Sequence, residues 1–91
     1  MPTKEMSTYL MAIVVSDFEG LKDEANVYKF SAWARPEAIE HAQYSQTIGP
    51  PLLEFFEDYT AIPYSFPKLD QVALPEYVSG ATENWGLVAY R

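Results

Sequence analysis

The sequence contains no cysteine and a single histidine, His41. Without cysteine the chain can form neither a disulfide nor a thiolate nucleophile, although this does not fix its compartment, because secreted proteins without cysteine exist. One histidine and no cysteine also supply too few of the ligands that zinc prefers. The composition therefore excludes thiol catalysis and a zinc site built from these residues alone.

Basic residues are scarce as well. Six lysines and arginines stand against 13 acidic residues, which gives a net charge of -7. Because nothing in such a chain would neutralise phosphates, the composition argues against nucleic acid as a partner and against an anionic membrane surface. The longest apolar run, Leu10 to Val15, is too short to span a bilayer.

Residues 7–18 are rich in β-branched and aromatic side chains and predict a strand that is apolar on both faces. Such a strand needs partners on both sides, and 91 residues make at most one small, marginally stable domain. We therefore expect the chain to be a fragment of a larger protein. The two faces would consist of Tyr9, Met11, Ile13 and Val15, and of Leu10, Ala12 and Val14.

Beyond this strand, residues 19–26 hold Gly20 and four charged residues and predict a loop. Residues 27–35 alternate and predict a second strand, paired antiparallel with the first. Residues 62–67 contain two prolines and predict irregular structure. Short strands are expected at 70–74 and 83–90.

Between these strands the sequence predicts a kinked helix. Pro36 and the acidic residues after it suit a first helical turn, so a helix is expected over 36–48. Gly49-Pro50-Pro51 should interrupt it, because proline in a helix removes a hydrogen bond. A second, amphipathic segment is expected over 50–59, with an acidic, solvated face opposite an apolar one. The apolar face would consist of Leu52, Phe55, Phe56 and Tyr59.

The candidate functional site is the run Gly80-Ala81-Thr82-Glu83-Asn84-Trp85-Gly86-Leu87. It combines a carboxylate, an amide and two glycines in a stretch of β propensity. Since glycine has no Cβ, a ligand or another backbone can approach closely at both glycines. Glu83 would face whatever approaches.

This run resembles the exopeptidase signature of the aminopeptidase N family of zinc metallopeptidases, usually Gly-Ala-Met-Glu-Asn. The resemblance covers nearly the whole chain, because further segments are similar to that family's in the same order. They are Tyr9-Leu10-Met11-Ala12, Val15-Ser16-Asp17-Phe18, Trp33-Ala34-Arg35-Pro36-Glu37-Ala38, Gly49-Pro50, Ile62-Pro63-Tyr64, Pro67-Lys68-Leu69-Asp70-Gln71 and Ala73-Leu74-Pro75.

The resemblance implies an α+β fragment of two domains. Residues 1–35 would end an amino-terminal β domain, and residues 36–91 would begin a thermolysin-like catalytic domain whose His-Glu-x-x-His helix follows outside this sequence. The parent protein would be a zinc-dependent enzyme that removes amino-terminal residues from peptides. The 91-residue chain would bind no zinc and would be inactive alone.

The resemblance also implies roles for the residues of the run. The carboxylate of Glu83 would receive the free α-amino group of a peptide, while Gly80 and Ala81 would offer backbone groups to it like an added strand. Thr82 departs from the usual methionine, which puts the size and preference of the pocket for the first substrate side chain in doubt. Asn84 would hold the turn by hydrogen bonds. The alternative is that Glu83 is an ordinary surface glutamate.

Other interpretations belong to different classes. The segment could instead be a protein-binding region, as in the membrane-anchored midgut members of this family that serve as receptors for bacterial insecticidal toxins. An extracellular or cell-surface parent is expected, with a cytoplasmic one as the alternative. An unrelated small soluble domain is the third interpretation. Asp70 and Glu76 could be read as a glycosidase acid/base pair, but nothing in their spacing distinguishes them from loop carboxylates. His41, one polar residue on a predicted helix, is expected at the surface and not in a catalytic role.

Overall fold

The computed structural model describes residues 3–22 and 27–91. The predicted α+β class is confirmed, because the described residues form five strands, one α-helix and two short 3-10 helices. The elements are η1 (Thr8–Leu10), β1 (Glu19–Lys22), β2 (Phe30–Ala34), η2 (Ile39–Ala42), α1 (Gln43–Thr60), β3 (Leu69–Ala73), β4 (Ala81–Asn84) and β5 (Leu87–Tyr90).

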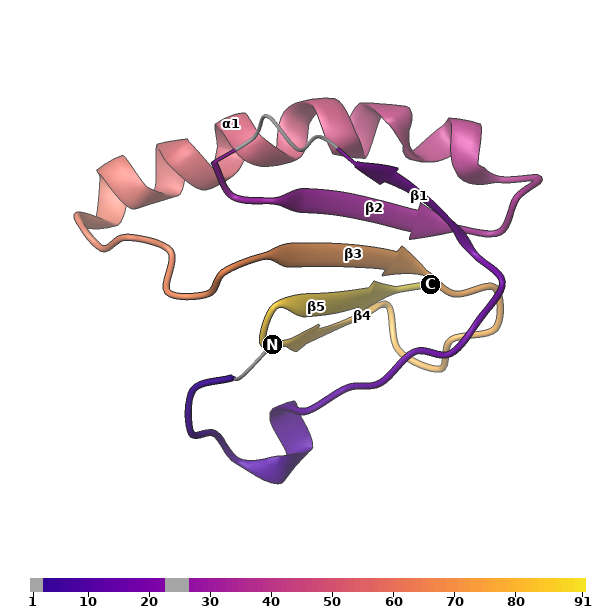
Figure 1. Cartoon of the computed structure of the whole chain (residues 1–91), viewed down its shortest axis with the longest axis horizontal. Coiled ribbons are helices and arrows are strands. Elements are labelled where there is room, and N and C mark those ends of the chain that lie inside the picture. The colour runs from indigo at the N-terminus through magenta and orange to yellow at the C-terminus, as the bar shows by residue number, and fades with distance from the viewer. Residues whose placement is uncertain (1–2, 23–26) are drawn as a thin grey trace.

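The five strands form one mixed sheet in the order β1-β2-β3-β5-β4 (Figure 1). β2 and β5 run parallel to β3, whereas β1 pairs antiparallel with β2 and β4 antiparallel with β5. The helix provides the crossover that a parallel β2–β3 pair requires. Strands that precede residue 35 and strands that follow it thus belong to the same sheet. The domain boundary expected between residues 35 and 36 remains a prediction.

The core lies where α1 packs on β2. Phe30, Ala32 and Ala34 are buried along one side of β2. A Cβ on Gly49 of the helix would lie 2.2 Å from Cζ of the Phe30 ring, so glycine is needed for this approach. The side-chain amide of Gln46 also donates to the Phe30 carbonyl at 3.0 Å. These contacts hold the helix against the sheet directly before its two prolines, Pro50 and Pro51.

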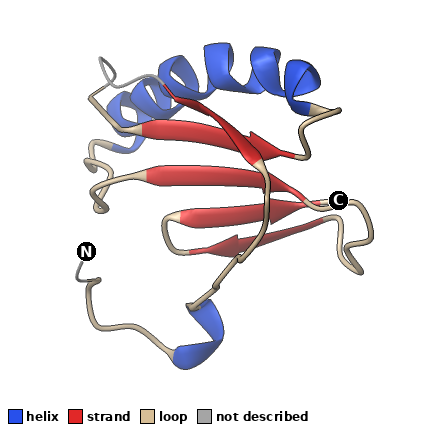
Figure 2. Ribbon diagram, turned by 45° about the vertical axis from the view of Figure 1, so that its right-hand side comes forward, coloured by secondary structure: helices blue, strands red, loops and turns tan. Residues whose placement is uncertain are grey.

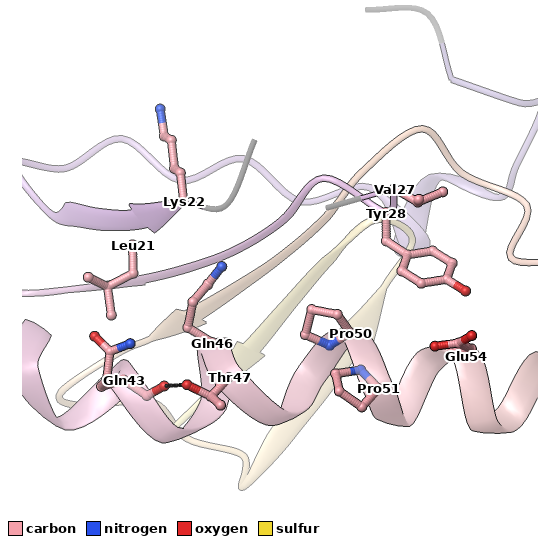
Figure 3. Close-up of a pocket in the computed structure, with 10 residues that line it drawn as sticks. All are labelled: Leu21, Lys22, Val27, Tyr28, Gln43, Gln46, Thr47, Pro50, Pro51 and Glu54. Carbon is pink, nitrogen blue, oxygen red and sulfur yellow. Dashed lines mark hydrogen bonds between the residues drawn. The ribbon is translucent and has the colours of Figure 1, made fainter. Parts of the chain in front are cut away.

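The predicted start of the helix at residue 36 is wrong, and α1 does not restart after Gly49-Pro50-Pro51. Residues 36–42 form a turn and η2, and α1 then continues from Gln43 to Thr60 through Pro50 and Pro51. Each proline removes one backbone bond, but the bonds on either side and the contact with Phe30 maintain the helix. Both prolines line a groove of about 730 Å³. Figure 3 shows their rings across from Tyr28.

The apolar face predicted for residues 50–59 is largely exposed. Phe55, Phe56 and Tyr59 are all more than half exposed. The acidic face is not simply solvated either, because Glu57 is half-buried. Its carboxylate accepts a hydrogen bond from the Tyr28 hydroxyl and another from the Tyr64 backbone N–H at 2.6 Å.

This carboxylate gives a prediction about stability and pH. The hydrogen bond from Tyr28, and then that from Tyr64, lowers the pKa of Glu57 below its ordinary value of 4.5. Because the folded pKa is depressed, its stabilising contribution is present above pH 4.5 and is lost as pH falls through the folded pKa. Tyr28→Phe removes the hydroxyl that donates to Glu57. The urea midpoint of this variant should therefore fall less than that of the unchanged chain as pH is lowered from about 6 to about 3. Tyr44→Phe, at an exposed tyrosine, is the control; equal slopes in both variants would contradict the prediction.

The predicted strand at 7–18 is wrong as well. Only residues 8–10 are regular, as η1, and residues 11–18 are irregular. Ile13 and Val15 are 80% and 94% exposed, because no described strand pairs with this segment. Its alternating pattern fits a strand, but a strand also needs a neighbour to satisfy its backbone.

The first strand lies instead within the predicted loop at 19–26, where β1 occupies residues 19–22 and pairs with β2. Residues 23–26 of that loop lie outside the described residues. Gly20 is opposite Trp33, and a Cβ there would lie 2.7 Å from the indole ring. Gly20 is therefore a packing residue of a strand and does not mark a turn.

The carboxyl-terminal part agrees better with the sequence. Residues 62–67 are irregular, and β3 nearly matches the strand expected at 70–74. The single strand expected at 83–90 is instead a hairpin, in which β4 and β5 are joined by Trp85 and Gly86. Gly86 has a φ of 73°, a left-handed conformation that glycine adopts without strain.

Candidate substrate-anchoring site

The candidate site is β4, which lies at one edge of the sheet (Figure 2). Among the described strands its only partner is β5. An edge strand presents a row of backbone groups that another chain can pair with. The groove beside Pro50 and Pro51 lies between α1 and residues of β1 and the chain entering β2, at the other end of the sheet. It therefore takes no part in this site.

The hydrogen bonds of β5 determine which backbone groups of β4 are free. The carbonyl of Gly86 accepts from the Asp70 N–H at 3.0 Å, and that of Tyr90 accepts from the Leu74 N–H at 2.7 Å. Alternate residues of β5, counted from Gly86, therefore face β3. The residues between them, Leu87 and Ala89, face β4.

The register of the hairpin then fixes the outer edge. Asn84 and Thr82 are opposite the two residues of β5 that face β4, so their backbone groups point inward. Gly80 continues this alternation, because its carbonyl accepts from the N–H of Arg91 at 3.0 Å. Ala81 and Glu83 lie between these positions. Their N–H and C=O groups point to the open edge.

The Glu83 side chain lies on the face of the sheet that carries α1. Phe30 defines this face, because its ring meets Gly49 of the helix. Residues directly opposite each other on neighbouring strands lie on the same face of a sheet. Followed from strand to strand, the face that carries Phe30 also carries Gln71 of β3 and Val88 of β5, and Val88 is directly opposite Glu83. The carboxylate is exposed, since α1 covers the other end of the sheet (Figure 1).

Thr82 and Asn84 point to the opposite face. The Thr82 hydroxyl accepts a hydrogen bond from the Tyr77 hydroxyl at 2.6 Å. The side-chain amide of Asn84 is buried and donates to the Tyr9 carbonyl at 3.4 Å. The backbone N–H of Trp85 donates to the Leu10 carbonyl at 3.3 Å. The end of β4 is thereby attached to η1.

The described residues do not fit a zinc ion. Within residues 3–22 and 27–91, no three His, Cys, Asp or Glu side chains could share a metal. His41 is exposed in η2, away from β4. Asp70 forms an ion pair with Lys68 at 2.7 Å, and Glu76 is exposed in the loop before β4. No described helix has the length and apolar character needed to cross a membrane.

The sequence pattern did not identify Tyr77 or Lys68 as parts of this site. Tyr77 holds Thr82, and Lys68 donates to the Gly86 carbonyl at 2.8 Å. Lys68 is 18 residues from Gly86 in the chain, so no local periodicity links them. The only available signal was that Lys68 belongs to a segment that resembles the aminopeptidase family.

Glu83 is thus an exposed glutamate on an open edge strand, within the run Gly-Ala-Thr-Glu-Asn. The model of the peptidase family M1 domain matches residues 44–91, more than half of the chain. The chain therefore belongs to peptidase family M1, as an aminopeptidase N-like member.

Relatives agree over almost the whole chain. It is 49% identical over 90 residues to endoplasmic reticulum aminopeptidase 1 of Homo sapiens and 46% identical over 92 residues to aminopeptidase N of Mus musculus. It is 43% identical over 90 residues to aminopeptidase N of Haemonchus contortus. Each match covers 98% of this chain but only 10%, 10% and 9% of the relative, so the chain spans about a tenth of the length of these proteins.

Proposed function

We propose that this chain is the segment of a zinc-dependent aminopeptidase that anchors the amino terminus of the peptide substrate. The observation that carries the proposal is the placement of Glu83, exposed on an edge strand whose free backbone groups belong to Ala81 and to Glu83 itself. A peptide can pair with this edge as an added strand. Its terminal ammonium would then meet the carboxylate.

The chemistry favours free amino termini. A hydrogen bond between an ammonium and a carboxylate is charge-assisted and stronger than one between neutral groups. A peptide whose amino terminus is acetylated loses that charge and leaves the carboxylate unpaired. The segment would therefore select exopeptidase substrates and exclude the interior of longer chains.

Gly80 and Asn84 would support the strand and not contact the substrate backbone. The Gly80 carbonyl is bonded to Arg91, and the Asn84 amide to Tyr9. Thr82 would border the pocket for the first substrate side chain. Since threonine is shorter than methionine and its hydroxyl is held by Tyr77, we infer a wider pocket than the family's usual methionine provides.

Zinc would be held by residues of the parent protein outside this chain, because the described residues offer no fitting set. We therefore expect the purified 91-residue chain to cleave no aminoacyl-arylamide, with or without added zinc, and to retain no zinc after dialysis. Hydrolysis measured with and without a chelator, together with elemental analysis, checks this. Chelator-sensitive turnover by the 91-residue chain would contradict it.

The parent would act outside the cytoplasm. Endoplasmic reticulum aminopeptidase 1 carries a non-cytoplasmic location in its name, and it matches 98% of this chain. This relationship supports a cell-surface or secretory-pathway parent, and any membrane attachment would be supplied by a segment elsewhere in that protein. Peptides with free amino termini in those compartments would be its substrates.

The second candidate is a protein-binding segment, such as a receptor region for a bacterial insecticidal toxin. The specific observation in its favour is the exposed apolar row Met11, Ile13 and Val15. Toxin retention by the 91-residue chain should then fall when Ile13 and Val15 are both changed to serine. Equal retention by the chain and this variant, or none by either, would reject the candidate.

A further inference from the structure

The turn that follows the anchor strand is held by several contacts at one atom. The carbonyl oxygen of Gly86 accepts two hydrogen bonds, one from the Asp70 N–H at 3.0 Å and one from Nζ of Lys68 at 2.8 Å. The first belongs to the pairing of β5 with β3. The second is a charge-assisted bond from a side chain, which is stronger than a neutral one.

Lys68 is itself fixed by its neighbours. Its Nζ lies 2.7 Å from Oδ2 of Asp70, and Oδ1 of the same carboxylate accepts from Nε1 of Trp33 at 3.1 Å. The Lys68 and Asp70 side chains are 37% and 22% exposed, so the pair is partly shielded from water. A continuous chain of polar contacts thus runs from β2, through the start of β3, to the turn.

The backbone at Lys68 is held close to the same turn. The Lys68 carbonyl accepts from the Tyr64 hydroxyl at 3.1 Å. Burial, and then the charge of Asp70, raises the pKa of Tyr64 to about 12, which keeps this donor protonated. A Cβ on Gly86 would lie only 3.4 Å from the Lys68 carbonyl oxygen. Lys68 therefore contacts the turn with both its side chain and its backbone.

We propose that Lys68 is a positioning residue for the substrate-anchoring Glu83, acting through the Trp85–Gly86 turn. The inference rests on the proposed function. Glu83 lies three residues before Gly86 on a strand of only four residues, and that strand has no partner on its outer side among the described strands. Fixing the turn therefore sets where the carboxylate meets the terminal ammonium.

The test is a double-mutant cycle in the full-length parent enzyme with an aminoacyl-arylamide substrate. Lys68→Met keeps the length of the side chain and removes its donors; we expect KM to rise roughly 5- to 10-fold with kcat within about twofold. Lys68→Arg, which keeps the charge, should recover most of the loss. In a Glu83→Gln background, Lys68→Met should add less than about twofold, because the group it positions is gone.

Controls separate positioning from general damage. Zinc content and thermal unfolding are measured for every variant, and Lys29→Met, at an exposed lysine, should leave KM unchanged. A competitive inhibitor with a free α-amine should weaken in Lys68→Met, whereas one without an amine should not. If Lys68→Met fails to fold, Asp70→Asn, which removes the partner that orients Nζ, should raise KM in the same direction.

Two results would overturn the inference. One is an unchanged KM in Lys68→Met and Asp70→Asn, and the other is a full additional loss when Lys68→Met is combined with Glu83→Gln. If Glu83→Gln alone has no effect, the proposed function fails, and the inference fails with it. A loss in Glu83→Gln with none in Lys68→Met overturns only the role of Lys68.

Discussion

Changing Glu83 to glutamine in the full-length parent enzyme should lower kcat/KM for an aminoacyl-arylamide by about 100-fold. The variant keeps the size and planarity of the side chain but loses the negative charge that meets the ammonium. Hydrogen bonds to charged groups contribute about 1.5–3 kcal/mol, which corresponds to roughly 10- to 150-fold in an equilibrium or rate. We expect the upper part of this range, because the glutamine amide can still accept a hydrogen bond but carries no charge to offset that of the ammonium, which the docked peptide would shield from water.

The control for this experiment is Glu76→Gln, at an exposed acid in the loop before β4. It changes the net charge equally and should leave kcat/KM within about twofold. The glutamine variant at position 83 should also lose its preference for free over acetylated amino termini. An unchanged kcat/KM, or an equal loss in both variants, would mean that Glu83 is an ordinary surface acid.

Changing Gly49 to alanine should destabilise the 91-residue chain by about 2 kcal/mol. Helix propensity alone predicts the opposite sign, because alanine in a helix is favoured over glycine by about 1 kcal/mol. The steric term is larger here. The new Cβ would lie 2.2 Å from Cζ of Phe30, whose ring is only 1% exposed and has little room to move.

The matched control is Gly80→Ala, because a Cβ on Gly80 meets nothing within 4 Å. Its free energy of unfolding should stay within about 0.5 kcal/mol of the unchanged chain. Phe30→Leu removes the ring atoms that would clash, so Gly49→Ala should cost little in that background. Urea denaturation measures each of these variants. Stabilisation by Gly49→Ala would show that the helix does not pack closely on Phe30.

The elements that the sequence predicts correctly are those whose structure is determined by residues close together in the chain. Residues 70–74 predict a short strand that Pro75 ends, and this prediction places β3 to within a residue. The strand predicted at 7–18 fails because alternation indicates a suitable side-chain pattern but not a partner, and no described strand pairs with it. The helix does not restart after Pro50 and Pro51, because part of its support comes from Phe30, a distant residue in the chain.

The candidate site shows the same division. The residues Gly80 to Asn84 can be chosen from their motif alone. That β4 is an edge strand, and that only Ala81 and Glu83 have outward backbone groups, depends on the strand order and on the register of three strands. No pattern in 80–87 contains this information. The contributions of Lys68 and Tyr77 are likewise contacts between distant segments, which no local pattern predicts.

The most direct test of the anchoring role is a crystal structure of the full-length parent enzyme with a bound peptide analogue that has a free amino terminus. We predict that the terminal nitrogen lies about 2.8 Å from a carboxylate oxygen of Glu83. We also predict that the peptide backbone pairs with the outward groups of Ala81 or Glu83. An amino terminus bound to other residues, with β4 covered by another strand of the parent, would contradict the anchoring role.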